Sequence, residues 1–352
     1  GTTRAISSVD TLGTLVQGTL LSPSPSDSSF NTSGNQATAS AQSNQQSNQI
    51  AVAAGSVQLD GTLPAFANTI QSASGSTQAQ SVVGTLGVNN ASTNSSGNQY
   101  IVNGNTAGST ASGNAGSTGV TVRADSNITG PSAMGPEAIV TVGNTQSFAG
   151  TGVSAHTKIT QLGSSMAPSP LGSSSGDTQT ISDNKVYASA QGSDATNTAS
   201  LQASGGIANT GAAMNNLQSH VGGNVSATTE VTALGSRALF SQDGSQTVTG
   251  NKLQATAQST RASNAVSIAG GALNFTPAAI SSTQTHTAGN TSATVDVAQL
   301  GSVRTTLGPL PVNTFTRDQQ TVSGNTLNAT ASSQTASNQA AISGTSLDNA
   351  GA

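Results

Sequence analysis

The side chains that could do chemistry are few, and they are scattered along the chain. The 352 residues include 13 Asp and Glu, 9 Lys and Arg and 3 His. His220 and His286 recur at one position of an internal repeat, but no acidic residue stands nearby in phase to orient either imidazole. A hydrolytic triad needs such an orienting acid. We therefore expect no catalytic residues and no enzyme activity.

Glu230 and Asp296 are the acidic residues that share a repeat position, so they could stack on one face and bind a cation. The same position holds Val82 and Lys158 in other copies, which favours solvated surface over a metal site. Polysaccharide-cleaving β-helices need clustered carboxylates and aromatic platforms, and the chain has only 2 Tyr, 6 Phe and no Trp. We expect no metal, no cofactor and no small-molecule substrate.

The composition excludes further classes of partner. Charged residues make up 6% of the chain, the net charge is -4, and the basic residues are not clustered. Nucleic acid and anionic lipid are therefore not expected as partners. No stretch approaches the roughly 20 apolar residues of a membrane helix. The absence of cysteine is compatible with either redox compartment. The start of the chain shows no signal-peptide core, and the absence of an initiating Met suggests a processed, secreted chain, although a trimmed chain has the same feature.

A long internal repeat organises the sequence. The pair Leu-Gly recurs with spacings of 74, 76, 72 and 66 residues. Its leucines are Leu12, Leu86, Leu162, Leu234 and Leu300. Segments 223–235 and 289–301 share their phase at every position, which indicates that one structural unit is copied. We predict a single domain, 1-352, with repeat units of approximately 1-85, 86-161, 162-233, 234-299 and 300-352; the proline-bearing stretch after each Leu-Gly predicts a loop.

A second signature pairs asparagines that are thirteen residues apart, the first preceded by Gly or Asp. The four pairs are Asn35 and Asn48, Asn184 and Asn197, Asn251 and Asn264, and Asn325 and Asn338. Asn224 and Asn290 mark a further turn, ten residues before a repeat leucine. The copy between Leu86 and Gly163 departs from the pattern, because Asn98 has no asparagine thirteen residues later. We expect that copy to be degenerate or to carry an insertion.

The stretches between these markers alternate small apolar and polar residues with a period of two, which predicts strands. Small side chains cannot fill an ordinary sandwich, but they can fill a narrow coil. We expect an all-β fold, a parallel β-solenoid (β-helix) of about five repeats of ~70 residues, the last incomplete. With roughly 20 to 35 residues per coil, the chain would make about 10 to 17 rungs and a rod about 50 to 80 Å long. The asparagines would either form an amide ladder between rungs or mark surface turns.

Uncapped solenoid ends template a further molecule. The first thirteen residues contain only the closing part of a repeat, and the last repeat stops before that part. We therefore expect the N-terminal strand of one subunit to complete the open rung of its neighbour. The expected polymer junction includes Val9, Leu12, Ile342 and Leu347.

The repeat resembles known self-assembling proteins. Gly250 and Asn251, followed by Ala255, Ala257, Gln258, Asn264 and Ile268, resemble the curlin repeat of bacterial functional amyloids. Segment 34–55, with its Gly-Asn and Asn-Gln-Gln-x-Asn motifs, is similar to Fap-type amyloid subunits. The resemblance implies a secreted fibre subunit of a biofilm matrix or cell surface.

Taken together, these features predict a structural protein, the subunit of an extracellular filament that polymerises head to tail with copies of itself. A β-helical adhesin or surface-layer component is the alternative, although no anchor or tip domain is visible. An ice-binding solenoid ranks third, because these repeats vary in length by ten residues while an ice binder needs a regular Thr array.

Overall fold

The computed structural model describes the chain in ten stretches. They are residues 1–16, 26–59, 65–90, 95–131, 138–166, 174–235, 237–238, 241–301, 303–304 and 318–348. Within them every regular element is a β-strand and every strand pairing is parallel, so the predicted all-β class is confirmed. The proline-bearing stretches predicted as loops, at Pro23, Pro168 and Pro309, lie outside the described residues.

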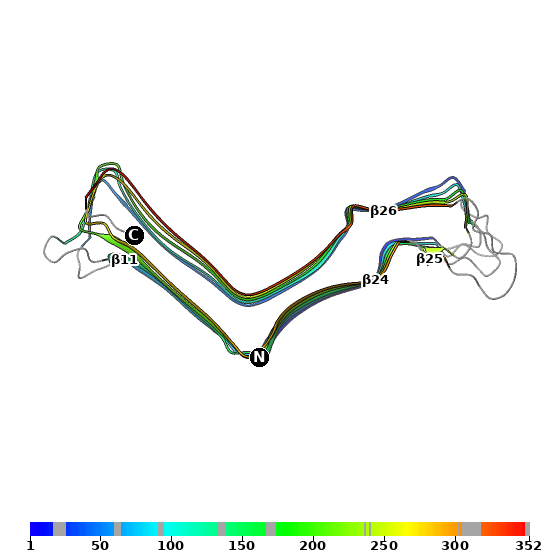
Figure 1. Ribbon diagram of the computed structural model, residues 1–352, viewed down its shortest axis with the longest axis horizontal. Coiled ribbons are helices and arrows are strands. Elements are labelled where there is room, and N and C mark those ends of the chain that lie inside the picture. Colours follow the sequence, from blue (N-terminus) through cyan, green and yellow to red (C-terminus); the bar gives the residue numbers. More distant parts are fainter. Residues whose placement is uncertain are drawn as a thin grey trace.

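Two sheets lie end to end and form one wall of the molecule, which we call the lower wall after its place in Figure 1. The β1 sheet stacks β1 (Thr2–Val16), β6 (Ser76–Asn90), β12 (Gly152–Met166), β18 (Asn224–Leu234) and β24 (Thr291–Leu300), with β19 (Arg237–Ala238) and β25 (Val303–Arg304) at its edge. The β5 sheet stacks β5 (Phe66–Ala73), β11 (Ala138–Phe148), β17 (Gly211–Val221) and β23 (Ala278–Thr287).

The opposite, upper wall contains the longest strands. The β3 sheet stacks β3 (Gln36–Ala54), β9 (Thr106–Ala124), β15 (Lys185–Ala203), β22 (Lys252–Asn274) and β27 (Thr326–Asp348), continued by β4 (Val57–Gln58), β10 (Ile128–Thr129) and β16 (Gly206–Ala208). The β2 sheet stacks β2 (Ser29–Ser33), β8 (Gln99–Asn103), β14 (Thr178–Ser182), β21 (Ser245–Thr249) and β26 (Gln319–Ser323). A small β7 sheet joins β7 (Ser95–Ser96), β13 (Ser174–Ser175) and β20 (Ser241–Gln242).

One circuit of the chain around both walls takes a whole repeat. Strand partners are 66 to 79 residues apart, as in Val225 with Thr291 and Thr106 with Lys185. The expectation of 20 to 35 residues per coil was therefore wrong, and so was the long rod. At about 4.8 Å per strand, five stacked strands occupy only about 24 Å, and stacking runs along the shortest axis of the molecule (Figure 1).

The molecule is a bent, flat slab. Seen down the stacking direction, both walls follow the same V, and the N-terminus lies at the bend, where the β5 sheet meets the β1 sheet (Figure 1). We call the β1 to β5 strands (residues 2–73) the first layer and the β24 to β27 strands (residues 291–348) the last layer.

Alternation along each strand places one set of side chains between the walls. In β5 every second residue is buried, and the same period runs through the first half of β3. The interior separates by position into a cluster of Val, Ile, Leu and Met in the arm under the β5 sheet, a second cluster of larger apolar residues in the other arm, and an Ala-rich cluster between them. Small side chains fill the interior mainly in the Ala-rich cluster. The arrangement is consistent with a parallel β-solenoid.

Candidate functional site

The first predicted set of asparagines forms a continuous ladder of hydrogen bonds. In each step the backbone N–H and the side-chain amide of one asparagine donate to Oδ1 of the next. The amide distances are 3.0 Å from Asn35 to Asn105, 2.9 Å from Asn105 to Asn184, 2.9 Å from Asn184 to Asn251, and 2.8 Å from Asn251 to Asn325. The three central members are fully buried, so the interpretation as surface turns does not describe this column.

In the second copy of the repeat, the sequence analysis looked for the ladder asparagine at the wrong residue. Asn105, not Asn98, occupies the ladder position in that copy. Asn98 belongs to a neighbouring turn, where its Oδ1 accepts from the backbone N–H of Ser28. Gly104 precedes Asn105 with a φ of 65°, which matches the positive φ of the residue before each of the other ladder asparagines, so the Gly-Asn pair at 104–105 was the missed signal.

The second predicted set joins the two walls. Asn197 donates to Asn264 at 2.8 Å, and Asn264 donates to Asn338 at 2.7 Å. In the second copy Thr118 takes the asparagine position, which is why no asparagine follows Asn105 after thirteen residues. Amides of the β5 sheet reach across to this column: Asn144 Nδ2 lies 2.9 Å from Asn197 Oδ1. Asn48 instead donates to the backbone and hydroxyl oxygens of β5, at Asn68 and Thr69.

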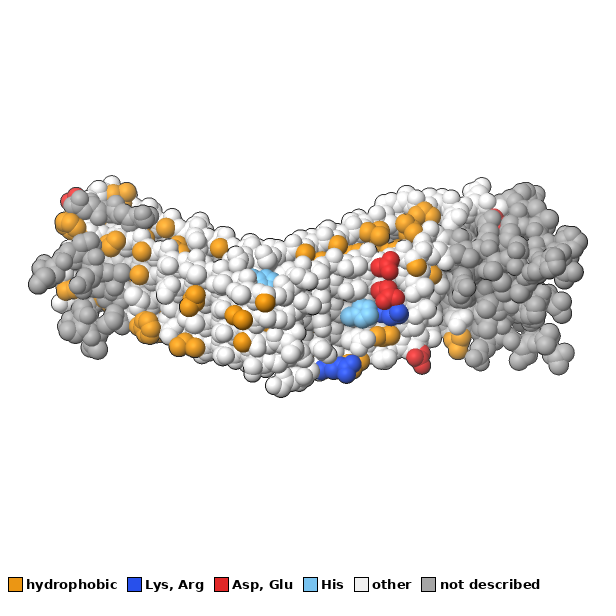
Figure 2. Space-filling model, turned by 60° about the horizontal axis from the view of Figure 1, so that its bottom comes forward, with side chains coloured by type: hydrophobic (Ala, Val, Ile, Leu, Met, Phe, Trp, Pro, Cys, Tyr) orange, Lys and Arg blue, Asp and Glu red, His pale blue; other side chains and the backbone are white. Residues whose placement is uncertain are grey.

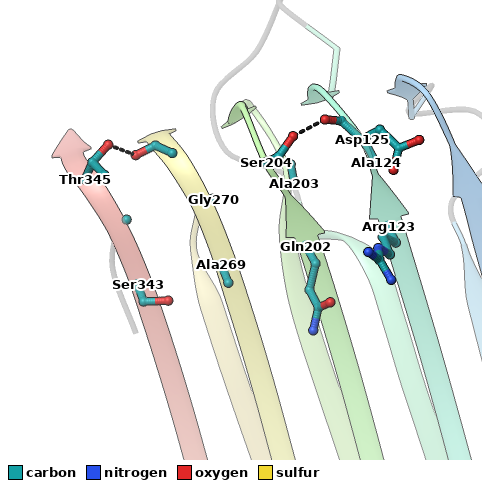
Figure 3. Close-up of a pocket in the computed structure, with 12 residues that line it drawn as sticks. Arg123, Ala124, Asp125, Gln202, Ala203, Ser204, Ala269, Gly270, Ser343 and Thr345 are labelled. Atoms are coloured by element: carbon teal, nitrogen blue, oxygen red, sulfur yellow. Dashed lines mark hydrogen bonds between the residues drawn. The ribbon is translucent and has the colours of Figure 1, made fainter.

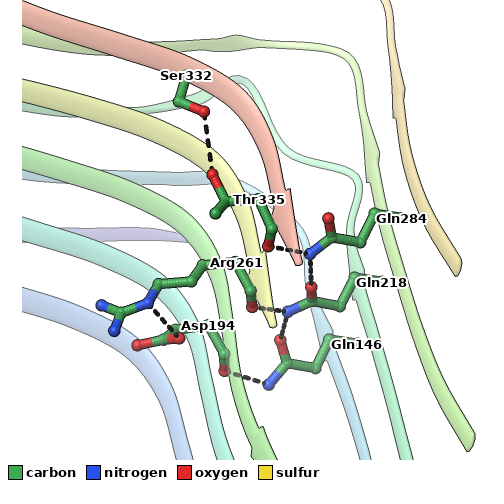
Figure 4. Close-up of polar contacts among 7 residues, drawn as sticks. All are labelled: Gln146, Asp194, Gln218, Arg261, Gln284, Ser332 and Thr335. Atoms are coloured by element: carbon green, nitrogen blue, oxygen red, sulfur yellow. Dashed lines mark hydrogen bonds and ion pairs between the residues drawn. The ribbon is translucent and has the colours of Figure 1, made fainter. Parts of the chain in front are cut away.

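A glutamine ladder runs beside it, and the sequence analysis missed it. Gln146, Gln218 and Gln284 each donate to the glutamine of the preceding layer, at 3.0, 2.9 and 2.7 Å, starting from Gln71. Figure 4 shows the last three of these glutamines. The same Nε2 atoms donate across the interior to backbone carbonyls of the β3 sheet, at Asp194, Arg261 and Thr335. The signal in the sequence was the recurrence of glutamine at one repeat position, in the strand before each turn.

The Leu-Gly pairs lie in register. Each repeat leucine pairs with the next, from Leu12 with Leu86 through to Leu234 with Leu300. Leu86, Leu162 and Leu234 are fully buried. The following glycines have φ between 102° and 151°, and a Cβ on any but the last would collide with the carbonyl of the next layer's glycine. The repeated Leu-Gly pair therefore places a buried leucine next to a glycine whose backbone contact with the next layer leaves no room for a side chain.

The remaining predicted positions lie at turns and at the edges of the stack. Asn224 and Asn290 are exposed, and the Asn290 N–H donates to Asn224 Oδ1 at 2.9 Å. Val9 and Leu12 lie in β1, which pairs with β6 of the same chain along its length. The N-terminal strand is thus part of the chain's own first layer rather than a free segment. Ile342 and Leu347 lie in β27, in the last layer, in register with Ile268 and Leu273.

The last layer leaves apolar side chains uncovered on the side away from the fourth layer. Leu300, Val322, Leu327 and Leu347 are each 41–57% exposed. Their register partners one layer below are Leu234, Val248, Leu253 and Leu273, and these are at most 1% exposed. Inward positions that a neighbouring layer would cover are therefore open to solvent here.

Comparison with known proteins adds no neighbour. No protein-family model, curated protein or solved structure matches the chain. Among the described residues, no helix is long and apolar enough to cross a membrane.

The acidic pair Glu230 and Asp296 lies on the outer surface of the β1 sheet, where charged side chains gather (Figure 2). Lys158 stands in the adjacent layer and its Nζ lies 2.7 Å from Glu230 Oε1, while His156 Nε2 lies 3.5 Å from Oε2. The hydrogen bond from Lys158 is the main cause that lowers the pKa of Glu230. A cationic side chain thus already occupies the place that a bound cation would take.

A shallow groove of about 580 Å³ crosses the outer face of the β3 sheet near its end. It is lined mainly by small residues, among them Ala269, Gly270 and Ser343, with Arg123 and Gln202 beside them (Figure 3). The Ser204 hydroxyl donates to the carbonyl of Asp125 within its wall. No described group of three or more His, Cys, Asp or Glu is placed to hold a metal ion.

The two repeated histidines face the interior at the bend. His220 is fully buried and stacks on Phe148 of the preceding layer, with ring centroids 4.9 Å apart. His286 of the next layer meets it edge to face at 5.0 Å. Neither ring nitrogen of His220 has a hydrogen-bond partner. Burial, and to a lesser degree the neighbouring His286, lowers the pKa of His220 to about 4.

We expect the buried imidazole to make stability depend on pH. As pH falls below about 6.5, the unfolded chain protonates His220 but the folded chain does not until about pH 4. Stability therefore falls through this window, by about 3 kcal/mol in total. His220→Phe, which repeats the ring of Phe148, should remove that part of the pH dependence, measured by urea unfolding between pH 7 and pH 4. The surface variant His156→Gln should keep it; an unchanged slope in His220→Phe would contradict the assignment.

Proposed function

We propose that the chain is the structural subunit of an extracellular filament that polymerises head to tail by stacking of layers. In this proposal the fold is a β-solenoid of about five ~70-residue repeats, each repeat making one layer. The resemblance of its Gly-Asn segments to curlin and Fap repeats supports a place in a biofilm matrix or on a cell surface. Polymerisation explains why so repetitive a chain has so few charged side chains to keep copies apart.

The observation that carries the proposal is the exposed inner side of the last layer. Leu300, Leu327 and Leu347 continue columns whose members are buried one layer below. A further layer in the same register would bury these side chains and pair the open backbone edge of β27. Unpaired parallel edges are templates for strand addition.

The asparagine ladder gives the stack a direction. Every step donates from the lower-numbered asparagine to Oδ1 of the higher-numbered one. Among the described residues, Oδ1 of Asn35 accepts no ladder bond at one end of the stack, and Asn325 donates no ladder bond at the other, although its side-chain amide donates to the Val248 carbonyl. The two ends are therefore complementary to each other and not to themselves, which supports head-to-tail rather than head-to-head stacking.

Two lysine substitutions on the last strand test the proposal. Ala331 continues a buried column of alanines formed by Ala111, Ala190 and Ala257, whereas Thr330 points outward on the same strand. Ala331→Lys would place a charge between the two walls, in the interior that a further layer would cover, and we expect it to abolish filaments. Thr330→Lys adds the same charge without burying it, so filaments should remain.

The measurement is electron microscopy of the purified wild-type chain and both variants, with power spectra examined for an axial reflection near 4.8 Å. Wild-type filaments with that reflection, lost only in Ala331→Lys, support the proposal. Isolated particles from the wild-type chain would sink it and favour the adhesin or surface-layer alternative. Equal filament formation by both variants would rule out stacking through the last layer.

A further inference from the structure

One outer surface of the molecule carries no charge. The outward positions of the β5 sheet are Phe66, Asn68, Ile70, Ser72, Thr141, Gly143, Thr145, Ser147, Ala213, Asn215, Leu217, Ser219, Val221, Ala279, Ser281, Thr283, Thr285 and Thr287. None is ionisable, and Phe66, Ile70, Leu217 and Val221 are exposed. We call this surface the β5 face.

The outer surfaces of the β1 and β3 sheets differ from the β5 face because they carry charged side chains. The outward face of the β1 sheet carries Lys158, Glu230 and Asp296, and that of the β3 sheet carries Lys185 and Arg261. Figure 2 shows the charged side chains over the β1 sheet, while the arm formed by the β5 sheet shows hydrophobic side chains among uncharged ones. Charges on a sheet surface oppose face-to-face packing, and the β5 face lacks them.

The β5 face has both projecting side chains and a depression. A groove of about 540 Å³ opens where Gly143 stands between Asn68 and Asn215 of the adjacent layers. Phe66 borders this groove, and Ile70 and Leu217 project farther along the same strands. A surface with both features can accept its own projections when a second copy is turned about a two-fold axis.

The size of the β5 face fits a second copy of the chain. Ten residues of strand extend about 33 Å, and four strands span about 19 Å, so the face offers roughly 600 Å² per copy. Two such faces bury about 1,200 Å², the lower limit of stable protein interfaces. In a filament the face would repeat with every subunit, so the contact would grow with length.

We propose that the β5 face binds the β5 face of a second copy, so that chains associate sideways as well as end to end. The contact packs two sheets face to face, with Leu217 and Ile70 of one copy in the depression at Gly143 of the other. Stacking and side-to-side pairing use different surfaces, so each can be removed without the other.

The test is carried out on the soluble Ala331→Lys chain, so that stacking does not obscure pairing. A double variant, Thr145→Lys with Leu217→Lys, adds two charges on adjacent layers of the β5 face. The matched control, Ser117→Lys with Thr196→Lys, adds the same charges on the same two layers of the β3 sheet. Sedimentation equilibrium should show dimers for the parent and the control, and a Kd at least 100-fold weaker for the β5-face variant.

Filaments of the chain without Ala331→Lys give a second readout. Paired filaments should become single when the β5 face carries the two lysines and should stay paired in the control. A monomeric Ala331→Lys parent together with only single filaments of the wild-type chain, or pairing that survives the β5-face lysines, would overturn the inference. If Ala331→Lys fails to block filaments, the stacking proposal fails, and the filament widths still decide the pairing.

Discussion

Replacing Gly163 by alanine should destabilise the chain by about 3 to 5 kcal/mol. Gly163 has a φ of 140°, and a Cβ there would fall well inside contact distance of the Gly235 carbonyl oxygen and 2.8 Å from Ile181 Cδ1. Backbone strain and the collision between layers add together, because neither the next layer nor the buried isoleucine can move without breaking the register. The loss should be measured as the free energy of unfolding in urea.

Gly55→Ala is the matched control, because a Cβ at Gly55 meets no atom within 4 Å and its φ is not in the left-handed region. It should change stability by less than about 0.5 kcal/mol. If Gly163→Ala were as mild as Gly55→Ala, the close approach of layers at the Leu-Gly pair would be wrong.

Asn184→Ala should cost about 3 to 5 kcal/mol, because it removes the central member of the buried asparagine ladder. The Asn105 backbone N–H and side-chain amide lose their acceptor, and the Val102 carbonyl loses the donor that Asn184 Nδ2 supplies at 3.0 Å. Buried polar groups without partners are costly because no water replaces the lost bond. Urea unfolding of the soluble chain measures the effect.

Asn35→Ala provides the comparison for the ladder. Asn35 stands at the first layer, is only partly buried and donates to Asn105 without receiving a ladder bond in return. Its loss leaves one lone pair of Asn105 free, and we expect a cost of about 1 kcal/mol or less. Equal losses of unfolding free energy in Asn35→Ala and Asn184→Ala would show that the ladder adds nothing beyond the preference of asparagine for turns.

Much of the fold followed from the sequence. The spacing of Leu86, Leu162 and Leu234 set the register of the β1 sheet, because a fully buried leucine and a side-chain-free glycine leave little freedom for a shift. The spacing of Asn184 and Asn251 likewise located one turn of each layer. These features could be predicted from the sequence because each residue type meets a local structural requirement.

The size of the coil could not be derived in the same way. Alternation shows that a segment is a strand, but it does not show where the chain turns back, and long strands such as β22 (Lys252–Asn274) read like several short ones. The glutamine ladder at Gln146 was missed because its meaning lies in contacts across the interior to Asp194, which repeat spacing does not reveal. The uncharged β5 face needed the structure for the same reason, since its members come from four strands.

The separation of 66 to 79 residues between paired strands has a kinetic consequence. A chain that folds alone must close a loop of that length before the first two layers gain any pairing, and the entropy of closure is not repaid until a full circuit is in place. Folding should therefore be slow and limited by nucleation. A chain that meets an existing layer needs no such closure, because its first circuit can be laid down on a surface already formed, so growth on a seed should be faster than spontaneous folding.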